Sequence, residues 1–162
     1  MSCPSPAAAV VIATCGRPDY LRATLKSLAE QSRLPDEVVV VDASDEATAV
    51  QVQAAVGLCF PYPIRYLRAA RPSAACQRNL GAAATSMDLV VFMDDDVDLR
   101  RDMLKELVAV FAMDVAGEVG GVSATIENCS SRPLSFLNRV ALWACIGPLP
   151  DSLGGRLVGP AV

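Results

Sequence analysis

Short apolar runs alternate along this chain with segments whose apolar residues recur at helical spacing. Apolar runs rich in β-branched residues and bounded by polar or turn residues are typical of buried strands. Such runs predict strands at 8–13, 38–41, 64–67, 88–93 and 119–126. Helical spacing predicts a helix that begins at Pro18 and further helices over 46–56, 102–113 and 134–146. Pro72 can lie in the first turn of another helix, rich in alanine, that runs to about Thr85.

The order of these elements predicts the fold class. Strands that alternate with helices and are apolar on both faces favour an α/β domain with a mostly parallel, Rossmann-like sheet flanked by helices. In such sheets, ligands bind beyond the carboxyl ends of the strands. The polar residues to inspect therefore follow the strands directly, and they are Thr14, Arg17, Asp42, Asp45, Arg68, Arg71, Asp94, Asp95 and Asp96.

Charge and composition exclude several classes of protein. The 162 residues include 14 Lys or Arg, 18 Asp or Glu and no His, for a net charge of −4. We therefore expect no nucleic-acid partner, no catalysis through a histidine and no histidine-bearing zinc site. The hydrophobic fraction of 52% is too high for a disordered chain. It predicts apolar surface for a further segment, for a membrane-associated C-terminal part or for a partner chain, including an oligomer.

The cysteines and the N-terminal segment bear on the cell compartment. Six cysteines occur at positions 3, 15, 59, 76, 129 and 145, and none forms a Cys-x-x-Cys pair. We interpret them as small buried apolar residues in a reducing compartment. No basic region precedes the first apolar run, so a secretory signal is not expected. These features predict a cytoplasmic protein, or one at the inner face of the membrane.

Three adjacent carboxylates, Asp94, Asp95 and Asp96, directly follow the fourth predicted strand. They cannot all ionise at low cost in a partly buried cleft unless a cation neutralises them. Mg²⁺ or Mn²⁺, which prefer carboxylate and phosphate oxygens, would do so and could hold a diphosphate. The alternative is a solvated acidic turn that caps the next helix.

Other strand-end residues allow two interpretations each. Asp42 could accept hydrogen bonds from a base or a ribose, or it could form an Asx turn. Arg17 and Arg71 could face phosphate oxygens, or they could be solvated side chains. The chain contains neither a P-loop motif nor a Gly-x-Gly-x-x-Gly motif after its first strand, which disfavours P-loop NTPases and Rossmann dehydrogenases.

Four segments, in order over residues 8–125, resemble the N-terminal part of family 2 glycosyltransferases. The first contains Val-Val-Ile-Ala-Thr-Cys-Gly-Arg-Pro, and the second contains Glu-Val-Val-Val-Val-Asp-Ala-Ser-Asp. The third contains Arg-Asn-Leu-Gly and the fourth contains Val-Phe-Met-Asp-Asp-Asp, which looks like the family's Asp-x-Asp motif. The resemblance implies the GT-A fold and metal-dependent transfer of a sugar, with inversion, from a nucleotide-diphosphate sugar to an acceptor.

The resemblance also implies roles for individual residues. Thr14, Arg17 and Asp42 would line the nucleotide pocket, and Arg71 or Arg78 would lie near the ribose or the diphosphate. The acidic residues complete this set: Asp94 and Asp95 would contact the nucleotide sugar, and Asp96 with Asp94 would bind Mg²⁺ or Mn²⁺.

One departure from the family concerns the general base, which is an acidic residue well downstream of Asp-x-Asp. The acidic residues after 126 are Glu127 and Asp151, and neither lies in a matching context. We therefore assign no base. We expect one domain over 1–162 that is incomplete at its C-terminus, with 127–162 as the start of a truncated acceptor region.

Three alternatives remain open at this point. The first is a non-catalytic fragment or subunit that binds a nucleotide-diphosphate sugar. The second is a nucleotidyltransferase of similar fold, disfavoured because the segment after the first strand has a single glycine, Gly16. The third is an unrelated α/β domain whose aspartates form turns.

Overall fold

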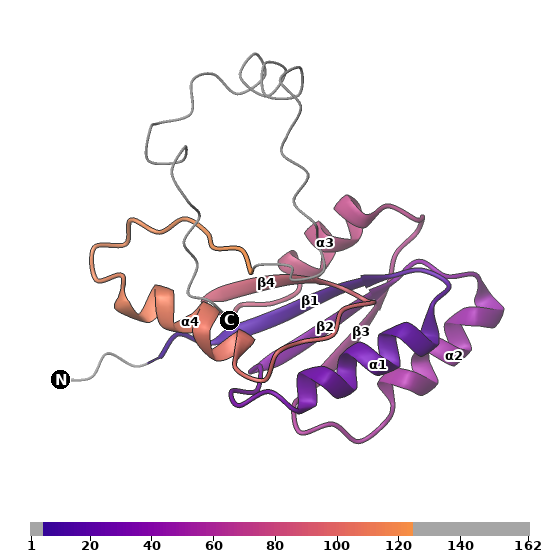
Figure 1. Ribbon diagram of the computed structural model, residues 1–162. Helices are drawn as coiled ribbons and strands as arrows, with labels where there is room; N and C mark the ends of the chain where they lie inside the picture. Colours follow the sequence, from indigo (N-terminus) through magenta and orange to yellow (C-terminus); the bar gives the residue numbers. More distant parts are fainter. Residues whose placement is uncertain (1–4, 125–162) are drawn as a thin grey trace, which may run out of the picture. The chain divides into compact units, whose positions relative to one another are not determined.

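The computed structural model describes residues 5–124, and this part of the chain contains four strands that alternate with four helices. The chain divides into two compact units, 1–122 and 123–162, and the fold described is that of the first. Its elements are β1 (Ala8–Thr14), α1 (Pro18–Ala29), β2 (Glu37–Asp42), α2 (Glu46–Val56), β3 (Ile64–Arg68), α3 (Ala74–Ala83), β4 (Leu89–Asp94) and α4 (Met103–Met113). The predicted α/β alternation is confirmed (Figure 1).

The four strands form one parallel sheet in the order β3-β2-β1-β4. The register aligns their carboxyl ends, because Thr14 lies opposite Asp42 and Asp42 lies opposite Arg68. On the other side of β1, Ala13 lies opposite Asp94. The polar residues that follow the strands are therefore gathered at one edge of the sheet, as the sequence predicts.

Helices cover both faces of this sheet, and side-chain alternation along β1 shows how. Val10 and Ile12 face the larger core, which contains apolar residues of α1, α2 and α4. Val11 points to the opposite face, where α3 packs against β1 and β2. Figure 1 shows α3 on the other side of the sheet from α1. This layering leaves the carboxyl ends of the strands between the start of α1 and the start of α3.

Gly81 allows α3 to approach the sheet closely. A Cβ atom built on this glycine would lie 2.3 Å from Val11 Cγ1 and 3.2 Å from Val41 Cγ2. Both valines are fully buried. The tight contact between helix and sheet at Gly81 fixes the distance of α3 from β1, and with it the position of the cavity-lining residues that α3 carries.

The fifth predicted strand is wrong over its described part. Residues 119–124 have no regular structure, and residues 125–126 lie outside the described residues. The segment contains Gly120 and Gly121, which weaken a strand because glycine loses the most backbone entropy and has no side chain to pack. The predicted helix 134–146 and the acceptor region 127–162 also lie outside the described residues.

Two further expectations need correction. Pro72 lies before the first turn of α3 and not in it: the helix begins at Ala74, because the Ser73 side chain accepts a hydrogen bond from Cys76 N and so acts as the N-cap. The cysteines at 15, 59 and 76 are exposed and not buried, because they lie in loops or on the outer side of a first helical turn. The other three cysteines lie outside the described residues.

Within the described residues, no helix is both long and apolar enough to cross a membrane.

Candidate donor-binding site

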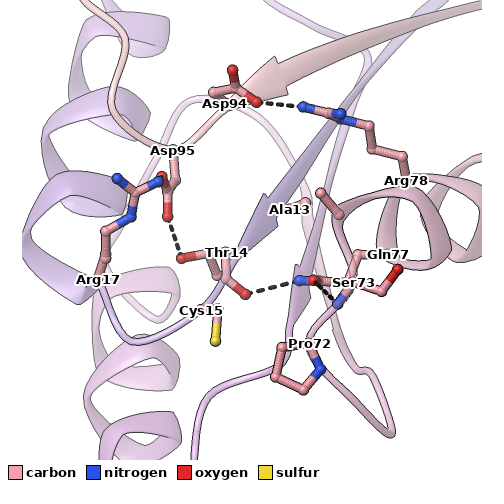
Figure 2. Close-up of a pocket in the computed structure, with 11 residues that line it drawn as sticks. Ala13, Thr14, Cys15, Arg17, Pro72, Ser73, Gln77, Arg78, Asp94 and Asp95 are labelled. Carbon is pink, nitrogen blue, oxygen red and sulfur yellow. Dashed lines mark hydrogen bonds and ion pairs between the residues drawn. The ribbon is translucent and has the colours of Figure 1, made fainter.

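A cavity of about 300 Å³ opens at the carboxyl ends of β1 and β4, beside the first turn of α3. Its position matches the general rule for parallel α/β sheets. The lining residues come from the end of β1 and the turn after it, from the segment that begins α3, and from the end of β4 (Figure 2). The lining consists of Ala13, Thr14, Cys15, Arg17, Pro72, Ser73, Ala74, Gln77, Arg78, Asp94 and Asp95.

Asp95 is the buried member of the acidic cluster, with 1% of its surface exposed. Thr14 Oγ1 donates a hydrogen bond of 2.6 Å to one of its carboxylate oxygens, and Arg17 Nη2 lies 2.5 Å from the other. The negative charge of Asp95 is the main reason why the pKa of Arg17 lies above its ordinary value. The carboxylate of Asp95 therefore joins the end of β1 to the start of α1.

Asp94 and Asp96 have exposed side chains, and each pairs with an arginine. Arg78 Nη2 lies 2.5 Å from Asp94 Oδ1, and Arg17 Nη1 lies 2.8 Å from Asp96 Oδ2. The alternative that these aspartates cap the next helix is wrong, because α4 begins at Met103. The cavity rim thus carries two carboxylate–guanidinium pairs, both partly exposed to solvent.

Gln77 on α3 fixes the floor of the cavity. Its side chain is 3% exposed and donates hydrogen bonds to the carbonyl oxygens of Thr14, at 2.9 Å, and of Val41, at 2.8 Å. Its own carbonyl oxygen accepts from Ser73 N at 3.2 Å. One amide group therefore connects the ends of β1 and β2 to the N-cap of α3. Gln77 is not among the site residues predicted from the sequence, although a glutamine in an alanine-rich helix is a signal that could have found it.

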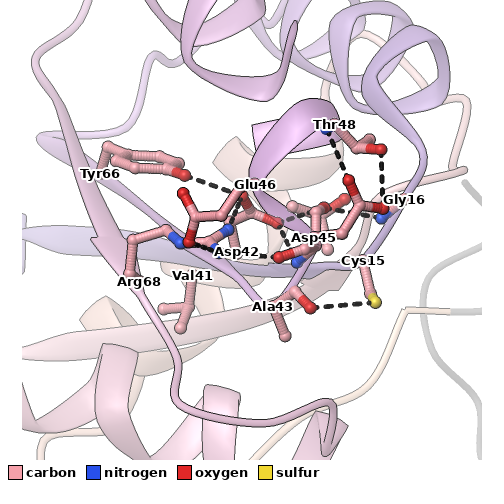
Figure 3. A network of polar contacts seen from close by, with 12 residues as sticks. Cys15, Gly16, Val41, Asp42, Ala43, Asp45, Glu46, Thr48, Tyr66 and Arg68 are labelled. Atoms are coloured by element: carbon pink, nitrogen blue, oxygen red, sulfur yellow. Dashed lines mark hydrogen bonds and ion pairs between the residues drawn. The ribbon is translucent and has the colours of Figure 1, made fainter. Parts of the chain in front are cut away.

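Asp42 is fully buried at the end of β2 and accepts four hydrogen bonds (Figure 3). Ser44 donates from its backbone N–H at 2.8 Å and from its hydroxyl at 2.5 Å. Tyr66 Oη and Arg68 Nη1 donate to the other carboxylate oxygen, at 2.7 and 2.8 Å. The bond from Ser44 N confirms the Asx turn that the sequence offered as one interpretation of Asp42.

Burial alone would raise the pKa of Asp42, because it disfavours the charged form. The hydrogen bonds from Ser44, Tyr66 and Arg68 favour the charged form, and together they leave the pKa below its ordinary value. Asp42 is therefore a carboxylate with its acceptor positions engaged by the protein.

The predicted site residues separate into two groups. The structure brings Thr14, Arg17, Arg78, Asp94 and Asp95 together around the cavity. Asp42, Arg71 and Asp96 are not among the lining residues. Arg71 is exposed, and with the Ser73 hydroxyl, which has the larger effect, it holds the pKa of the Cys76 thiol below its ordinary value. Asp96 lies at the rim through its pair with Arg17.

A divalent cation fits this rim only with help from a second ligand. Within 5–124, no three Asp, Glu, Cys or His side chains come together as a metal-binding group. Mg²⁺ is usually held by one or two carboxylates, with substrate phosphates and water completing its octahedron. The exposed carboxylates of Asp94 and Asp96 match that donor set in kind and in number. These residues therefore fit a cation that a diphosphate also coordinates.

Solved structures with a similar fold are glycosyltransferases. Staphylococcus aureus TarS, residues 1–349 with UDP, aligns with a TM-score of 0.56 at 23% identity, over 74% of this chain and 38% of that one. Glucosyl-3-phosphoglycerate synthase from Mycobacterium tuberculosis, with Mn²⁺, UDP-glucose and phosphoglyceric acid, aligns with a TM-score of 0.51 at 22% identity, over 70% of this chain and 40% of that one. The fold is that of the GT-A glycosyltransferases.

The sequence places the chain within that class. The model of the family described as "Glycosyl transferase family 2" matches residues 9–143, and the chain belongs to this family. The chain spans about two fifths of the length of the solved structures described above. No curated protein matches it significantly.

Proposed function

We propose that this chain forms the donor-binding domain of an enzyme that transfers a sugar from a nucleotide-diphosphate sugar to an acceptor. The observation that carries the proposal is the cavity at the ends of β1 and β4, whose rim holds two arginines and two exposed carboxylates. A cation and a diphosphate present the charges complementary to this set. Because similar structures contain UDP or UDP-glucose, a uridine nucleotide is the first donor to test.

The basic residues of the rim bind one ligand and the acidic residues bind the other. Arg17 and Arg78 bind the diphosphate oxygens through guanidinium hydrogen bonds. Asp94 and Asp96 hold Mg²⁺ or Mn²⁺. The cation, when bound, neutralises the charge that develops on the leaving diphosphate. Asp95 and Thr14 act on the donor indirectly, because they orient Arg17 from within the protein.

Asp42 acts on the nucleotide side of the site through its neighbours. Its carboxylate is fully buried and engaged by Ser44, Tyr66 and Arg68. We therefore assign it the task of orienting these side chains at the end of β2 and β3. Direct contact with a base would require one of these partners to leave the carboxylate.

The stereochemical course we propose is inversion in a single displacement at the anomeric carbon. Asp94 and Asp95 are the carboxylates that line the described cavity, and both are bonded to arginines. We assign neither as the base that deprotonates the acceptor. That base belongs to a part of the enzyme beyond the described residues.

The proposal is tested by ligand-induced stabilisation of the 162-residue chain. UDP at about 100 times its Kd, with Mn²⁺ or Mg²⁺, raises the free energy of unfolding by about 2.7 kcal/mol and therefore raises Tm. Asp96→Ala abolishes the increase that depends on the metal. Asp19→Ala, which removes a more exposed carboxylate on α1, preserves it. The proposal is wrong if none of UDP, GDP, ADP and CDP raises Tm in the presence of Mn²⁺ or Mg²⁺.

A second candidate is binding of the nucleotide sugar without transfer. It is favoured by one observation: Asp94 and Asp95, the carboxylates that line the described cavity, are both paired with arginines, so neither is available as the base that transfer requires. The two candidates are separated by measuring UDP release and sugar transfer from UDP-glucose with this chain. If nothing beyond hydrolysis of UDP-glucose is observed, binding without transfer is supported. Efficient transfer of the sugar to an added acceptor refutes it.

A further inference from the structure

The two carboxylate–arginine pairs at the cavity rim support an inference about how the ligands bind, and this inference rests on the proposed function. In this structure, the groups assigned to the cation are bonded to the groups assigned to the diphosphate: Asp96 to Arg17 at 2.8 Å and Asp94 to Arg78 at 2.5 Å. Side chains in both pairs are at least 38% exposed. Exposed ion pairs contribute little to stability, so they can exchange partners at low cost.

Arg17 differs from Arg78 because it is held in place. One guanidinium nitrogen, Nη2, lies 2.5 Å from the buried carboxylate of Asp95, while the other, Nη1, contacts Asp96. Asp95 is in turn fixed by the Thr14 hydroxyl at 2.6 Å. Arg17 can therefore release Asp96 without leaving the site. Its positive charge stays beside any cation that binds to Asp96.

This geometry weakens the binding of a cation by itself. The cation must displace Arg17 Nη1 from Asp96 and then lie near the anchored guanidinium, and like charges at short range repel. The described residues also supply too few carboxylates for a complete coordination shell. A diphosphate removes both obstacles, because its oxygens accept hydrogen bonds from Arg17 and supply the remaining metal ligands.

The same geometry weakens the binding of a diphosphate by itself. Asp94 and Asp96 carry negative charge at the rim, and they compete with the phosphate oxygens for Arg78 and Arg17. A cation that binds these carboxylates frees both arginines. In each pair, the cation therefore binds the carboxylate and the diphosphate binds the arginine.

We propose that Arg17 is an internal competitor of the divalent cation for Asp96, and that cation and nucleoside diphosphate consequently bind with positive coupling. The coupling is reciprocal: the diphosphate increases the affinity for the cation by the same factor by which the cation increases the affinity for the diphosphate. Each ligand therefore binds more weakly alone than in the presence of the other.

Equilibrium binding of the 162-residue chain tests this proposal without an activity assay. Mn²⁺ affinity is measured by electron paramagnetic resonance with and without saturating UDP, and UDP affinity by calorimetry with and without Mn²⁺. For the wild type, UDP increases the Mn²⁺ affinity by at least about fivefold, at the lower end of typical coupling between two ligands. Arg17→Gln increases the affinity for Mn²⁺ alone severalfold and reduces the coupling factor.

Two further variants control for folding and for general charge. Arg17→Lys keeps a positive charge on the buried Asp95 but has one ammonium group, which cannot bond to Asp95 and Asp96 as the two guanidinium nitrogens do. It therefore also tightens binding of Mn²⁺ alone. Arg22→Gln removes an arginine of α1 that pairs with Asp19 at 3.2 Å, and it leaves all affinities unchanged.

The outcomes separate this inference from the proposed function. If the wild type binds Mn²⁺ and UDP independently, the inference is wrong while the donor site stands. It is also wrong if Arg17→Gln and Arg17→Lys both leave the affinity for Mn²⁺ alone unchanged. If Mn²⁺ and UDP together do not bind the wild type at all, the proposed function fails and the inference fails with it.

Discussion

Replacement of Gly81 by alanine tests whether the close approach of α3 to the sheet controls the cavity. The new Cβ would lie 2.3 Å from Val11 Cγ1, whereas carbon atoms at optimal separation are about 3.5–4.0 Å apart. Helix and sheet must therefore separate locally by about 1 Å or more. Val11 cannot easily turn away, because it is fully buried and its β-branched side chain is stiff.

The magnitude follows from two opposing effects. Overpacking of a well-packed core costs about 1–3 kcal/mol, and a contact as short as 2.3 Å puts Gly81→Ala in the upper half of that range, at about 2–3 kcal/mol. Alanine offsets part of this cost, because it is more favourable than glycine inside a helix by about 1 kcal/mol. We therefore expect Gly81→Ala to lower the free energy of unfolding by about 1–2 kcal/mol, and Tm by about 2–8 °C. UDP affinity also falls, because α3 carries Gln77 and Arg78.

The assay is urea unfolding of four proteins: wild type, Gly81→Ala, Val11→Ala and the double variant. Val11→Ala removes the methyl group that the new Cβ meets. The double variant is therefore more stable than the sum of the two single effects predicts. Gly120→Ala is the matched control, since a Cβ there meets nothing within 4 Å. It changes the free energy of unfolding by less than about 0.5 kcal/mol. Stability of Gly81→Ala at or above the wild-type value, or strict additivity in the cycle, refutes the argument.

Three further predictions concern buried polar groups. Because the pKa of Asp42 is lowered in the native protein, its carboxylate adds stability above its unfolded pKa of about 3.9, and this contribution is lost as pH falls through the native pKa. The difference in unfolding free energy between wild type and Asp42→Asn, measured by urea titration, therefore shrinks from pH 6 to pH 2. A difference that stays constant over this range contradicts the prediction. Gln77→Leu removes three hydrogen bonds, so it lowers the free energy of unfolding by about 1–3 kcal/mol and weakens UDP binding by calorimetry, whereas the exposed Gln53→Leu does neither. Tyr62→Phe removes the hydroxyl that donates to the Leu25 carbonyl oxygen at 2.5 Å, and it lowers Tm in calorimetric scans by the equivalent of about 1 kcal/mol without affecting UDP affinity.

The four strands, their alternation with helices and the parallel sheet could be predicted from the sequence because most of the strands are apolar runs bounded by turn residues. The strand order β3-β2-β1-β4 was not predicted. The strand-end rule then located Thr14, Arg17 and Asp94 at one edge, and the structure places all three around the cavity. The failure at 119–124 has a local cause. Its apolar residues favour a strand, but two adjacent glycines interrupt them, and nothing in the sequence indicates which effect is larger.

The environment of individual aspartates was harder to predict, because it depends on residues far away in the chain. Asp42 is bonded to Tyr66 and Arg68, which come from the neighbouring strand and reach it only through the sheet register. The three adjacent aspartates look alike in sequence. Asp95 is buried because it continues the alternation that buries Met93, two residues earlier. That signal was present in the sequence.

The pairing of β1 with β4 has a consequence for synthesis on the ribosome. The hydrogen bond from Thr14 to Asp95 joins residues 81 positions apart. At about 5–20 residues per second, translation needs about 4–16 s to supply the second residue after the first. Until then, one edge of β1, which is apolar from Ala8 to Ala13, lacks its partner and is open to pairing with another chain. The residues of the cavity therefore cannot come together until Asp95 has been synthesised, and slow non-local pairing of this kind makes chaperone protection of the nascent chain valuable.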